Sequence, residues 1–273
     1  MSSETPRRKD ERPQPEERPS KASVGRLLSV AAAVVAVIGG LVALGRFGYG
    51  EWSDWQDEQP DAEYERLEQL RAGIPLSQFQ DILDEEDADV RRFPEGLIRH
   101  LYVRDYDYVL AVTDADQTVV SFSVMVREED FHPTFSDRIV LGETTVASAW
   151  DTPGALAGVC GRPVQYFERS RDPSIAEPRV QALGVSGNGY VTESDLDLVC
   201  NADSALEACK SYLTGDAELA EGAAVDCFLN SAEGRTLREG LRPNVYAESA
   251  PHKPLLYEHL TLSDDEILSA EED

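Results

Sequence analysis

Two aspartates on either side of a tyrosine are the first residues whose types and spacing could do chemistry. Asp105 and Asp107 flank Tyr106 between two stretches rich in β-branched and aromatic residues. A close pair of carboxyl groups can provide an acid and a base, or cleave a glycosidic bond. In a turn between strands, however, both carboxylates would be solvated, and a chain with 52 acidic residues among 273 contains close pairs by chance. We therefore expect solvation of this pair rather than catalysis.

A histidine in an aromatic segment is the second candidate. The segment Asp130–Asp137 reads DFHPTFSD, and its two phenylalanines should anchor it to a core. His132 could then serve as a ligand, a base or a pH sensor, or it could bond a backbone carbonyl beside Pro133. Because the four histidines are widely spaced, at positions 100, 132, 252 and 259, the sequence predicts no metal site. We expect no cofactor either.

Two known motifs are matched only in part in the distal half of the chain. The stretch GVSGN, from Gly184 to Asn188, is close to the nucleophile elbow G-x-S-x-G, but its fifth residue is asparagine. The twelve residues from Gly184 to Asp195 also approach a calcium-binding loop, although its first place, which requires a carboxylate, is a glycine. We expect Ser186–Gly189 to form a hairpin turn between two strands instead.

The four cysteines all lie in the distal half. An even number of cysteines in an exported domain favours two disulfides, and no C-x-x-C spacing indicates structural zinc. Three pairings are open on sequence alone, of which Cys160–Cys200 with Cys209–Cys227 is preferred.

Two helices and three strands are predicted to position Asp105, Asp107 and His132. Apolar residues recur at helical spacing over Asp61–Ala72, and Ser77 should cap a second short helix. Alternating and β-rich stretches then predict three antiparallel strands, joined in part by a hairpin turn at Asp114–Gln117. The predicted strands are Leu97–Val103, Tyr108–Thr113 and Thr118–Val126.

A second unit has elements in a comparable order, so residues 61–140 and 141–232 could be repeats. A helical stretch is expected within residues 145–158, and Asp203–Leu213 is expected to be an amphipathic helix. Strands are predicted at Val164–Arg169, Arg179–Val185 and Ala224–Leu229. Residues 233–273 are interrupted by prolines and are expected to be an irregular acidic segment. The predicted fold class is α+β, with helices beside an antiparallel sheet.

A transmembrane helix is predicted before these units. Residues 27–45 contain no charge and are bounded by Arg26 and Arg46, and a helix of this length nearly spans a bilayer. Residues 1–26 are polar and rich in proline, so they are expected to be a disordered tail. Residues 46–60 would form a juxtamembrane linker.

The orientation of this helix follows from its flanking charges. Seven of the eight basic residues in positions 1–46 precede the apolar run, which predicts a cytoplasmic N-terminus and an exported C-terminal part in the plasma membrane. The run is too long for a signal peptide, and no convincing cleavage site follows it. Small residues at Ala32, Ala36 and Gly40 share one face, so weak homodimerisation of the helix is a further expectation.

The net charge limits the partners of the exported part. The chain carries −27, and residues 1–46 have eight basic and five acidic side chains, so residues 47–273 carry −30. Such a domain repels nucleic acid and anionic lipid headgroups, which excludes both as ligands. It could attract cations or a basic partner, although a solvated surface would have the same composition.

A set of short segments between Tyr64 and Trp150 carries a resemblance to a known family. These segments are YERLEQLRAG, the Y-x-x-D-x-D-Y run of Tyr102–Tyr108, AVTDADQTV, DFHPTF and LGETT. Through them the chain resembles a family of uncharacterised single-pass bacterial membrane proteins, mainly from actinomycetes, named after a hypothetical protein of an enterotoxigenic enteric bacterium. That family has no established activity, so the resemblance implies a location and no chemistry.

The predicted order of helices and strands is also similar, at the level of topology, to small envelope assembly lipoproteins and to proteinaceous β-lactamase inhibitors. Both are binding modules without catalysis. The favoured interpretation is therefore a membrane-anchored, extracytoplasmic protein that binds an unknown protein partner or ligand. The alternative is an exported hydrolase or cation-dependent enzyme that uses Asp105, Asp107 and His132. A pocket joining these three side chains would favour the enzyme, whereas an exposed sheet face or edge would favour the binding protein.

Overall fold

The computed structural model describes most of the chain beyond residue 60. The described residues are 61–93, 96–135, 138–151, 153–170, 179–210, 220–255, 260–262 and 267. The predicted tail, transmembrane helix and linker within residues 1–60 therefore lie outside the described residues, as do Asp137 and His259. Among the helices of the described part, none is long and apolar enough to span a bilayer.

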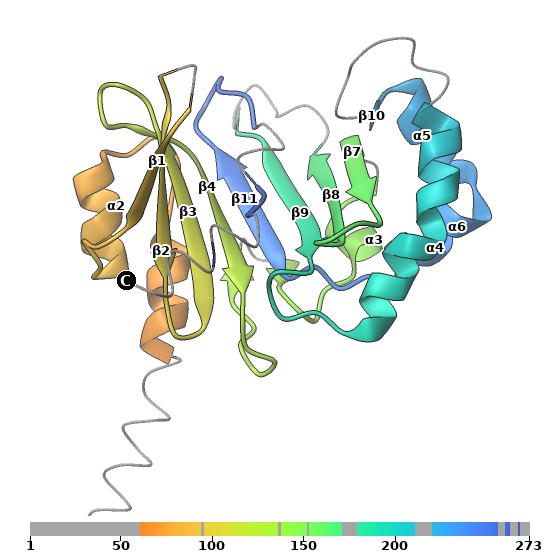
Figure 1. The fold of residues 1–273 in the computed structure, drawn as a ribbon, viewed down its shortest axis with the longest axis horizontal. Helices are drawn as coiled ribbons and strands as arrows, with labels where there is room; N and C mark the ends of the chain where they lie inside the picture. Colours follow the sequence, from red (N-terminus) through yellow and green to blue (C-terminus); the bar gives the residue numbers. More distant parts are fainter. Residues whose placement is uncertain are drawn as a thin grey trace, which may run out of the picture. The chain divides into compact units, whose positions relative to one another are not determined.

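One large antiparallel sheet organises the described residues (Figure 1). Its nine strands run in the order β1-β2-β3-β4-β11-β9-β8-β7-β10, and every pairing is antiparallel. The strands are β1 (Asp89–Arg92), β2 (Ile98–Val103), β3 (Asp107–Thr113), β4 (Val119–Val126), β7 (Pro153–Val159), β8 (Gln165–Ser170), β9 (Gln181–Ser186), β10 (Ala220–Glu221) and β11 (Val245–Ser249). A separate pair consists of β5 (Thr134–Phe135) and β6 (Ile139–Val140). The predicted α+β class with a large antiparallel sheet is confirmed.

The three strands predicted in the first unit are those that the structure contains as β2, β3 and β4. The expected turn between β3 and β4 is stabilised by Asp114, whose Oδ1 accepts hydrogen bonds from the backbone N–H groups of Asp116 and Thr118. Gln117 adopts a positive φ of 59°, which closes this turn. Local sequence alone therefore accounts for the hairpin.

Two helices cover one face of this half of the sheet. Residues 61–69 are helical, and α2 (Leu76–Leu83) follows after a turn at Gly73. Leu67, Leu70, Phe79 and Leu83 are fully buried against side chains of β2, β3 and β4. The expected cap at Ser77 is wrong, because α2 begins two residues earlier than a cap at this position would place it. Pro75 is its N-cap residue, and the Leu76 N–H donates to the carbonyl of Gln117 in the β3–β4 turn instead.

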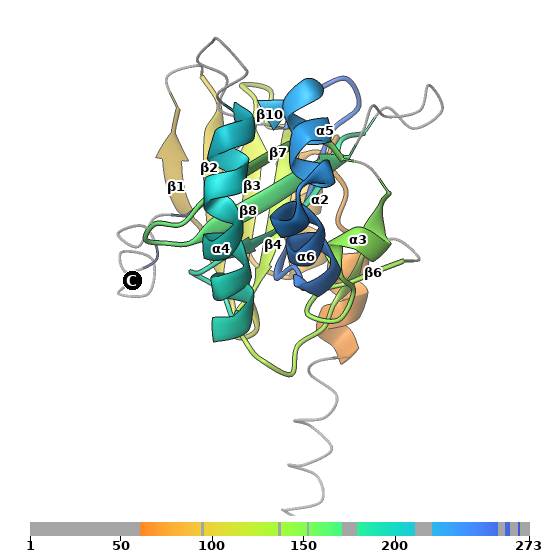
Figure 2. The same ribbon diagram turned by 90° about the vertical axis from the view of Figure 1, so that its right-hand side faces the viewer.

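A second group of helices covers the same face of the other half. These are α3 (Val146–Ala149), α4 (Glu193–Lys210), α5 (Ala223–Asn230) and α6 (Ala232–Gly240). On β9, Leu183 belongs to the core under α2, whereas Val185 belongs to the core under α4, α5 and α6. Because residues two apart on a strand share a face, both helical groups lie on one side of the sheet. Figure 2 shows α4, α5 and α6 in front of β7 and β8.

The opposite face of the sheet is covered by the C-terminal segment. Leu255, Leu260 and Leu262 are buried against side chains of β2, β3, β4, β8, β9 and β11. The guanidinium of Arg99 on β2 also donates to the carbonyl of Thr261. Sheet residues are therefore buried on both faces, which explains why β3, β4 and β11 are buried at every position.

Several expectations for the second unit are wrong. Ala224–Leu229 lies in α5 and is not a strand, because Ala224, Val225 and Phe228 are buried at helical spacing. Ser186–Gly189 is not a hairpin turn, since the chain leads on into α4, and the N–H of Tyr190 donates to the carbonyl of Val126. The helix expected from Asp203 begins ten residues earlier, at Glu193.

The C-terminal segment, residues 233–273, is not irregular throughout. It contains most of α6 and the central strand β11, which lies between β4 and β9. The order of elements also differs between the two predicted units: two helices precede the strands in residues 61–140, whereas in residues 141–232 α3 precedes β7, β8 and β9, and α4, β10 and α5 follow them. Since β11 joins the two sets of strands, they form one continuous sheet.

Both disulfides have the preferred pairing. Cys160, just after β7, is bonded to Cys200 in α4, and Cys209 near the end of α4 is bonded to Cys227 in α5. No cysteine is free. The two bonds tie α4 to the sheet at one point and to α5 at another, so they brace the helical layer of this half.

Thiol counting tests these bonds in the cell. Protein isolated from its native cells and denatured without a reductant should contain no free thiol if the chain is exported as predicted, because disulfides persist in oxidising compartments. After reduction the same sample should contain four free thiols, one for each cysteine. Four free thiols before reduction would contradict both the bonds and an exported position.

Candidate functional site

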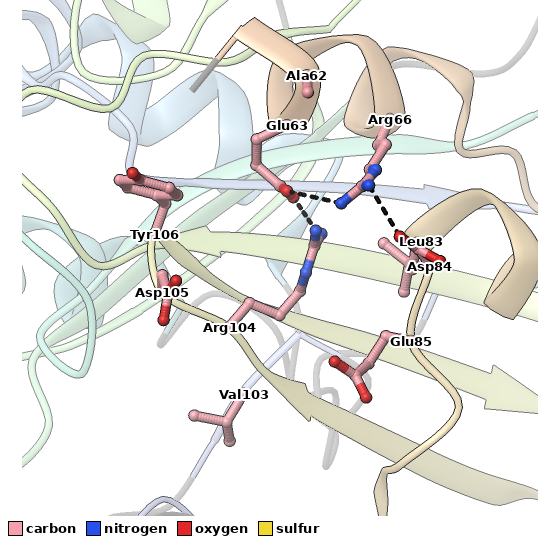
Figure 3. A pocket seen from close by; sticks show the side chains of 10 residues that line it. All are labelled: Ala62, Glu63, Arg66, Leu83, Asp84, Glu85, Val103, Arg104, Asp105 and Tyr106. Carbon is pink, nitrogen blue, oxygen red and sulfur yellow. Dashed lines mark hydrogen bonds and ion pairs between the residues drawn. The ribbon is translucent and has the colours of Figure 1, made fainter. Parts of the chain in front are cut away.

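A cleft of about 350 Å³ opens between the helix of residues 61–69, the end of α2 and the β2–β3 turn (Figure 3). We refer to it as the Glu63–Arg104 cleft, after the two side chains that meet in it. Its lining is mostly charged, with apolar surface from Ala62, Leu83 and Val103. The charged residues that line it are Glu63, Arg66, Asp84, Glu85, Arg104 and Asp105.

Three elements position these charges. Glu63 and Arg66 lie one turn apart on the first helix, so both project from one side of it. Asp84 is the C-cap residue of α2 and has a left-handed conformation, with φ of 56°. The β2–β3 turn holds Arg104 through a hydrogen bond from its N–H to the carbonyl of Asp107.

Ion pairs cross the cleft. Arg104 Nη2 contacts Glu63 Oε1, and both side chains are nine-tenths buried, with exposed fractions of 8% and 10%. Arg66 lies 3.6 Å from Glu63 Oε2 and 3.0 Å from Asp84 Oδ2. The Asp84 side chain is 77% exposed, so its pair with Arg66 contributes little to stability. The dashed lines in Figure 3 follow these contacts from one wall to the other.

A third buried charge lies next to Arg104. The Asp107 side chain is fully buried, and Arg104 Nη1 is 3.7 Å from its Oδ1. Neither carboxylate oxygen has a hydrogen bond within the described part of the chain. Burial raises the pKa of Asp107 from its ordinary value of 3.8 to about 7, against the opposing effect of the Arg104 charge. Burial also raises the pKa of Glu63, again against the effect of Arg104.

Incompletely bonded polar atoms are concentrated at this end of the sheet. Among the described residues, the buried side-chain atoms without a close polar partner are Arg104 Nη1 and both carboxylate oxygens of Asp107. Glu63 Oε1, in contrast, contacts Arg104 Nη2. Burial raises the pKa of Tyr102, on β2 two residues before Arg104, and its hydroxyl interacts with the side chain of Gln80. Buried polar groups in native proteins are nearly always bonded, so this concentration is exceptional.

A second buried carboxylate, that of Glu168, has hydrogen-bond partners for both of its oxygens. Glu168 on β8 is fully buried, yet it accepts hydrogen bonds from the Tyr166 hydroxyl at 2.7 Å, Trp150 Nε1 at 3.1 Å and Arg238 Nε at 2.8 Å. Arg238 Nη2 also donates to the carbonyl of Trp150 at 2.6 Å. Because every member of this network has partners, we assign it a structural role.

A second, smaller cleft of about 130 Å³ is lined by His132 together with residues that precede and begin α4. His132 Nδ1 is 3.1 Å from the carbonyl of Leu141, so this ring bonds a backbone carbonyl, as one of the two interpretations of the sequence expected. The Thr192 hydroxyl donates to Oδ2 of Asp195, which also lines this cleft, and accepts from the backbone N–H of Asp195, so the two residues cap the start of α4. These contacts give His132, Thr192 and Asp195 structural roles.

The three residues proposed as catalytic are not gathered in one place. Asp105 is exposed and lines the Glu63–Arg104 cleft, Asp107 is buried beside it, and His132 lines the second cleft. Neither of these two clefts is lined by all three residues. Tyr106, which lies between the two aspartates, stacks on Phe131, the residue before His132, with 5.1 Å between the ring centroids.

The expectation that Asp107 is solvated is wrong. It is the first residue of β3, and its side chain shares a face with Val109, which is in the helix-covered core. Sequence reasoning also missed Glu63 and Arg104, which are 41 positions apart. Their pairing depends on how the first helix crosses the sheet, and no local spacing reveals it. No group of three or more potential metal ligands occurs in the described ranges.

Comparisons of the chain with protein-family models, with curated proteins and with solved structures found no match. The resemblance of Tyr64–Trp150 to uncharacterised single-pass membrane proteins stays a prediction.

Proposed function

We propose that the chain is a membrane-anchored protein whose exported part binds a partner at the Glu63–Arg104 cleft. The observation that supports this most directly is the group of buried, incompletely bonded polar atoms on Arg104 and Asp107, next to the cleft. Each such atom costs folding free energy, and proteins retain these costs mainly where function requires them. The saturated network around Glu168 supports the same view, since this chain satisfies a buried carboxylate where only structure is at stake.

The proposed location rests on sequence and on the disulfides. The uncharged residues 27–45 are long enough for a membrane helix, and seven basic residues before them favour a cytoplasmic N-terminus in the plasma membrane. Two disulfides favour an oxidising environment for the remainder of the chain. The cleft would then face the outside of the cell.

The contacts of the charged side chains and of His132 favour binding over catalysis. Glu63 and Arg104 contact each other, and His132 bonds a backbone carbonyl at the second cleft. Asp107 is fully buried, so no substrate atom reaches it without rearrangement of Arg104. An enzyme that uses Asp105, Asp107 and His132 would need all three in one pocket.

Site-specific photocrosslinking in native membranes tests the binding function. A photoreactive residue at Ala62, which is exposed on the wall of the cleft, should yield a crosslinked adduct. This position carries no charge, so the substitution leaves the ion pairs intact. The matched control is Val159, which is 46% exposed at the end of β7 and belongs to neither cleft. An adduct from both positions, or from neither, would contradict binding at this cleft.

A further inference from the structure

We infer that the edge strand β1 is an interface at which two copies of this chain pair in antiparallel fashion, with Val90 on the symmetry axis. β1 is the last strand on its side of the sheet, and among the described residues it pairs only with β2 (Figure 2). All four of its residues are exposed. An edge strand can accept a further strand from another molecule, because half of its backbone groups face away from the sheet. This inference does not depend on the Glu63–Arg104 cleft.

Two residues of β1 direct their backbone groups away from the sheet. The N–H of Phe93 donates to the carbonyl of Leu97, which fixes the hydrogen-bonded positions of the β1–β2 ladder. These positions alternate along an antiparallel pair, so Val90 and Arg92 present their N–H and C=O groups to the outside. A second strand can bond these groups only where its own outward-facing residues lie opposite them.

The charges of β1 select one symmetric register for such a pair. When Val90 lies opposite Val90 of the second copy, each Asp89 lies opposite Arg91 of the other copy. This position is a non-hydrogen-bonded one, where side chains are closest, and the symmetry forms the ion pair twice. A slide by two residues in one direction leaves within β1 only Asp89 against Asp89, and in the other direction it places Arg91 against Arg91. Because like charges directly opposite are destabilising, the register centred on Val90 is favoured.

The neighbouring strand β2 supplies an independent reason for an acidic group at this edge. Arg91 lies directly opposite Arg99 of β2 in the same chain. The pKa of Arg99 is lowered mainly by burial and also by the charge of Arg91, against the effect of Asp89. Two cations directly opposite each other destabilise a pair of strands. Asp89 of a second copy would lie on the far side of Arg91 from Arg99 and would offset this repulsion.

Val90 gives the centre of the interface an apolar contact. It is 53% exposed and is one of two large apolar side chains in the described part of the chain that are left exposed; the other is Val159. In the selected register the two Val90 side chains lie opposite each other on one face, and the ion pairs lie on the other face. Pairs of β-branched side chains across neighbouring strands stabilise a sheet, so pairing would cover this exposed side chain usefully.

The interface is small, so its strength depends on how the chains are confined. An edge of four residues buries less than the roughly 1,000 Å² of a stable complex. The net charge of −27 also repels two copies over a distance, although β1 itself has one acidic and two basic residues. Anchoring by the proposed membrane helix, residues 27–45, would hold the chains in one plane and raise their effective concentration. We therefore expect a weak dimer that forms in the membrane.

Disulfide crosslinking of the full-length protein in its native membrane tests the interface. All four native cysteines are bonded, so Val90→Cys introduces a single free thiol. In the paired strands the two Cα atoms at this position are about 5.5 Å apart, which suits a disulfide. Under mild oxidation Val90→Cys should give a covalent dimer at about ten-fold the yield of Asp116→Cys, a control in the exposed β3–β4 turn. Equal yields, or no dimer from Val90→Cys, would overturn the inference.

A charge reversal and a charge exchange, both combined with Val90→Cys, test the register. Arg91→Asp places two carboxylates opposite each other in both symmetric pairs and should lower the dimer yield about five-fold or more. Asp89→Arg together with Arg91→Asp exchanges the charges and should return the yield to within about two-fold of Val90→Cys alone. These positions are exposed, so the core stays intact. An unchanged yield with Arg91→Asp would show that the membrane helix alone brings the chains together. That result, or a charge exchange that fails to restore the yield, would overturn the inference.

Discussion

Replacing Arg238 by Met is expected to lower the free energy of unfolding by about 3–5 kcal/mol. Arg238 donates from Nε to the Glu168 carboxylate at 2.8 Å and 3.2 Å, and from Nη1 and Nη2 to the carbonyls of Asp151 and Trp150. The Met side chain keeps much of the apolar stem but removes the charge. Glu168, which is fully buried, would then be a carboxylate without a cation in an apolar core. Urea denaturation of the full-length protein, followed by tryptophan fluorescence, measures the loss.

A double variant shows whether the uncompensated charge is the cause. Arg238→Met combined with Glu168→Gln removes both charges. The Gln oxygen can accept from Trp150 Nε1, and its amide N–H can donate to the Tyr166 hydroxyl, at the positions of the two carboxylate oxygens. Both variants lack the bonds from Arg238 to the carbonyls of Asp151 and Trp150. The double variant should therefore be more stable than Arg238→Met alone, because a buried charge pair costs more when one member is removed than when both are. If the double variant is the less stable of the two, the loss comes from packing and the carbonyl contacts rather than from charge.

The parts of the fold that follow from the sequence are those set by neighbours in the chain. β2, β3 and β4 follow each other with short turns, and Asp114 fixes the turn between β3 and β4 through its own side chain. The preferred disulfides also join cysteines that are consecutive in the sequence. For the strands and their turn the information lies within one short stretch of chain, whereas the disulfides span 40 and 18 residues and their pairing was a preference among three.

The parts that sequence reasoning missed depend on long-range contacts. β11 reads as part of a proline-interrupted segment, yet it is the strand that pairs with both β4 and β9 at the centre of the sheet. The six residues around Cys227 are too few to separate a strand from a helix, and the packing of Ala224 and Phe228 against α4 and α6 decides for a helix. Tertiary packing therefore determined both elements.

The candidate site illustrates the same limit. The sequence singled out Asp105 and Asp107 because they are close together, but their environments differ completely, since one is exposed and the other is fully buried. Glu63 gives no local indication that it lies opposite Arg104, because the turn at Gly73, α2 and two strands separate them in the chain. The spacing of the two aspartates drew attention to the β2–β3 turn. Only the fold shows that Glu63, Arg104 and Asp107 are buried next to this turn.

Replacing Asp107 by Asn is expected to stabilise the protein increasingly as the pH rises from about 4 to 7. Burial raises the pKa of Asp107 in the folded protein from 3.8 to about 7, so between these values the folded state holds a proton that the unfolded state has released. Stability from this group is therefore complete below about pH 4 and is lost as the pH rises through 7. The difference between Asp107→Asn and the natural protein should grow by roughly 3–4 kcal/mol over this range.

Urea denaturation at pH values from 4.5 to 8.5 measures this difference for both proteins. Arg104, Glu63 and Arg127 are the charged groups that act on Asp107, and all three are kept in the variant. Asp116→Asn, in the exposed β3–β4 turn, is the matched control for the loss of one acidic side chain. A pH dependence as large in this control as in Asp107→Asn would contradict the assignment to Asp107. If the difference for Asp107→Asn does not change with pH, Asp107 is ionised throughout, and the positive charges of Arg104 and Arg127 compensate for its burial.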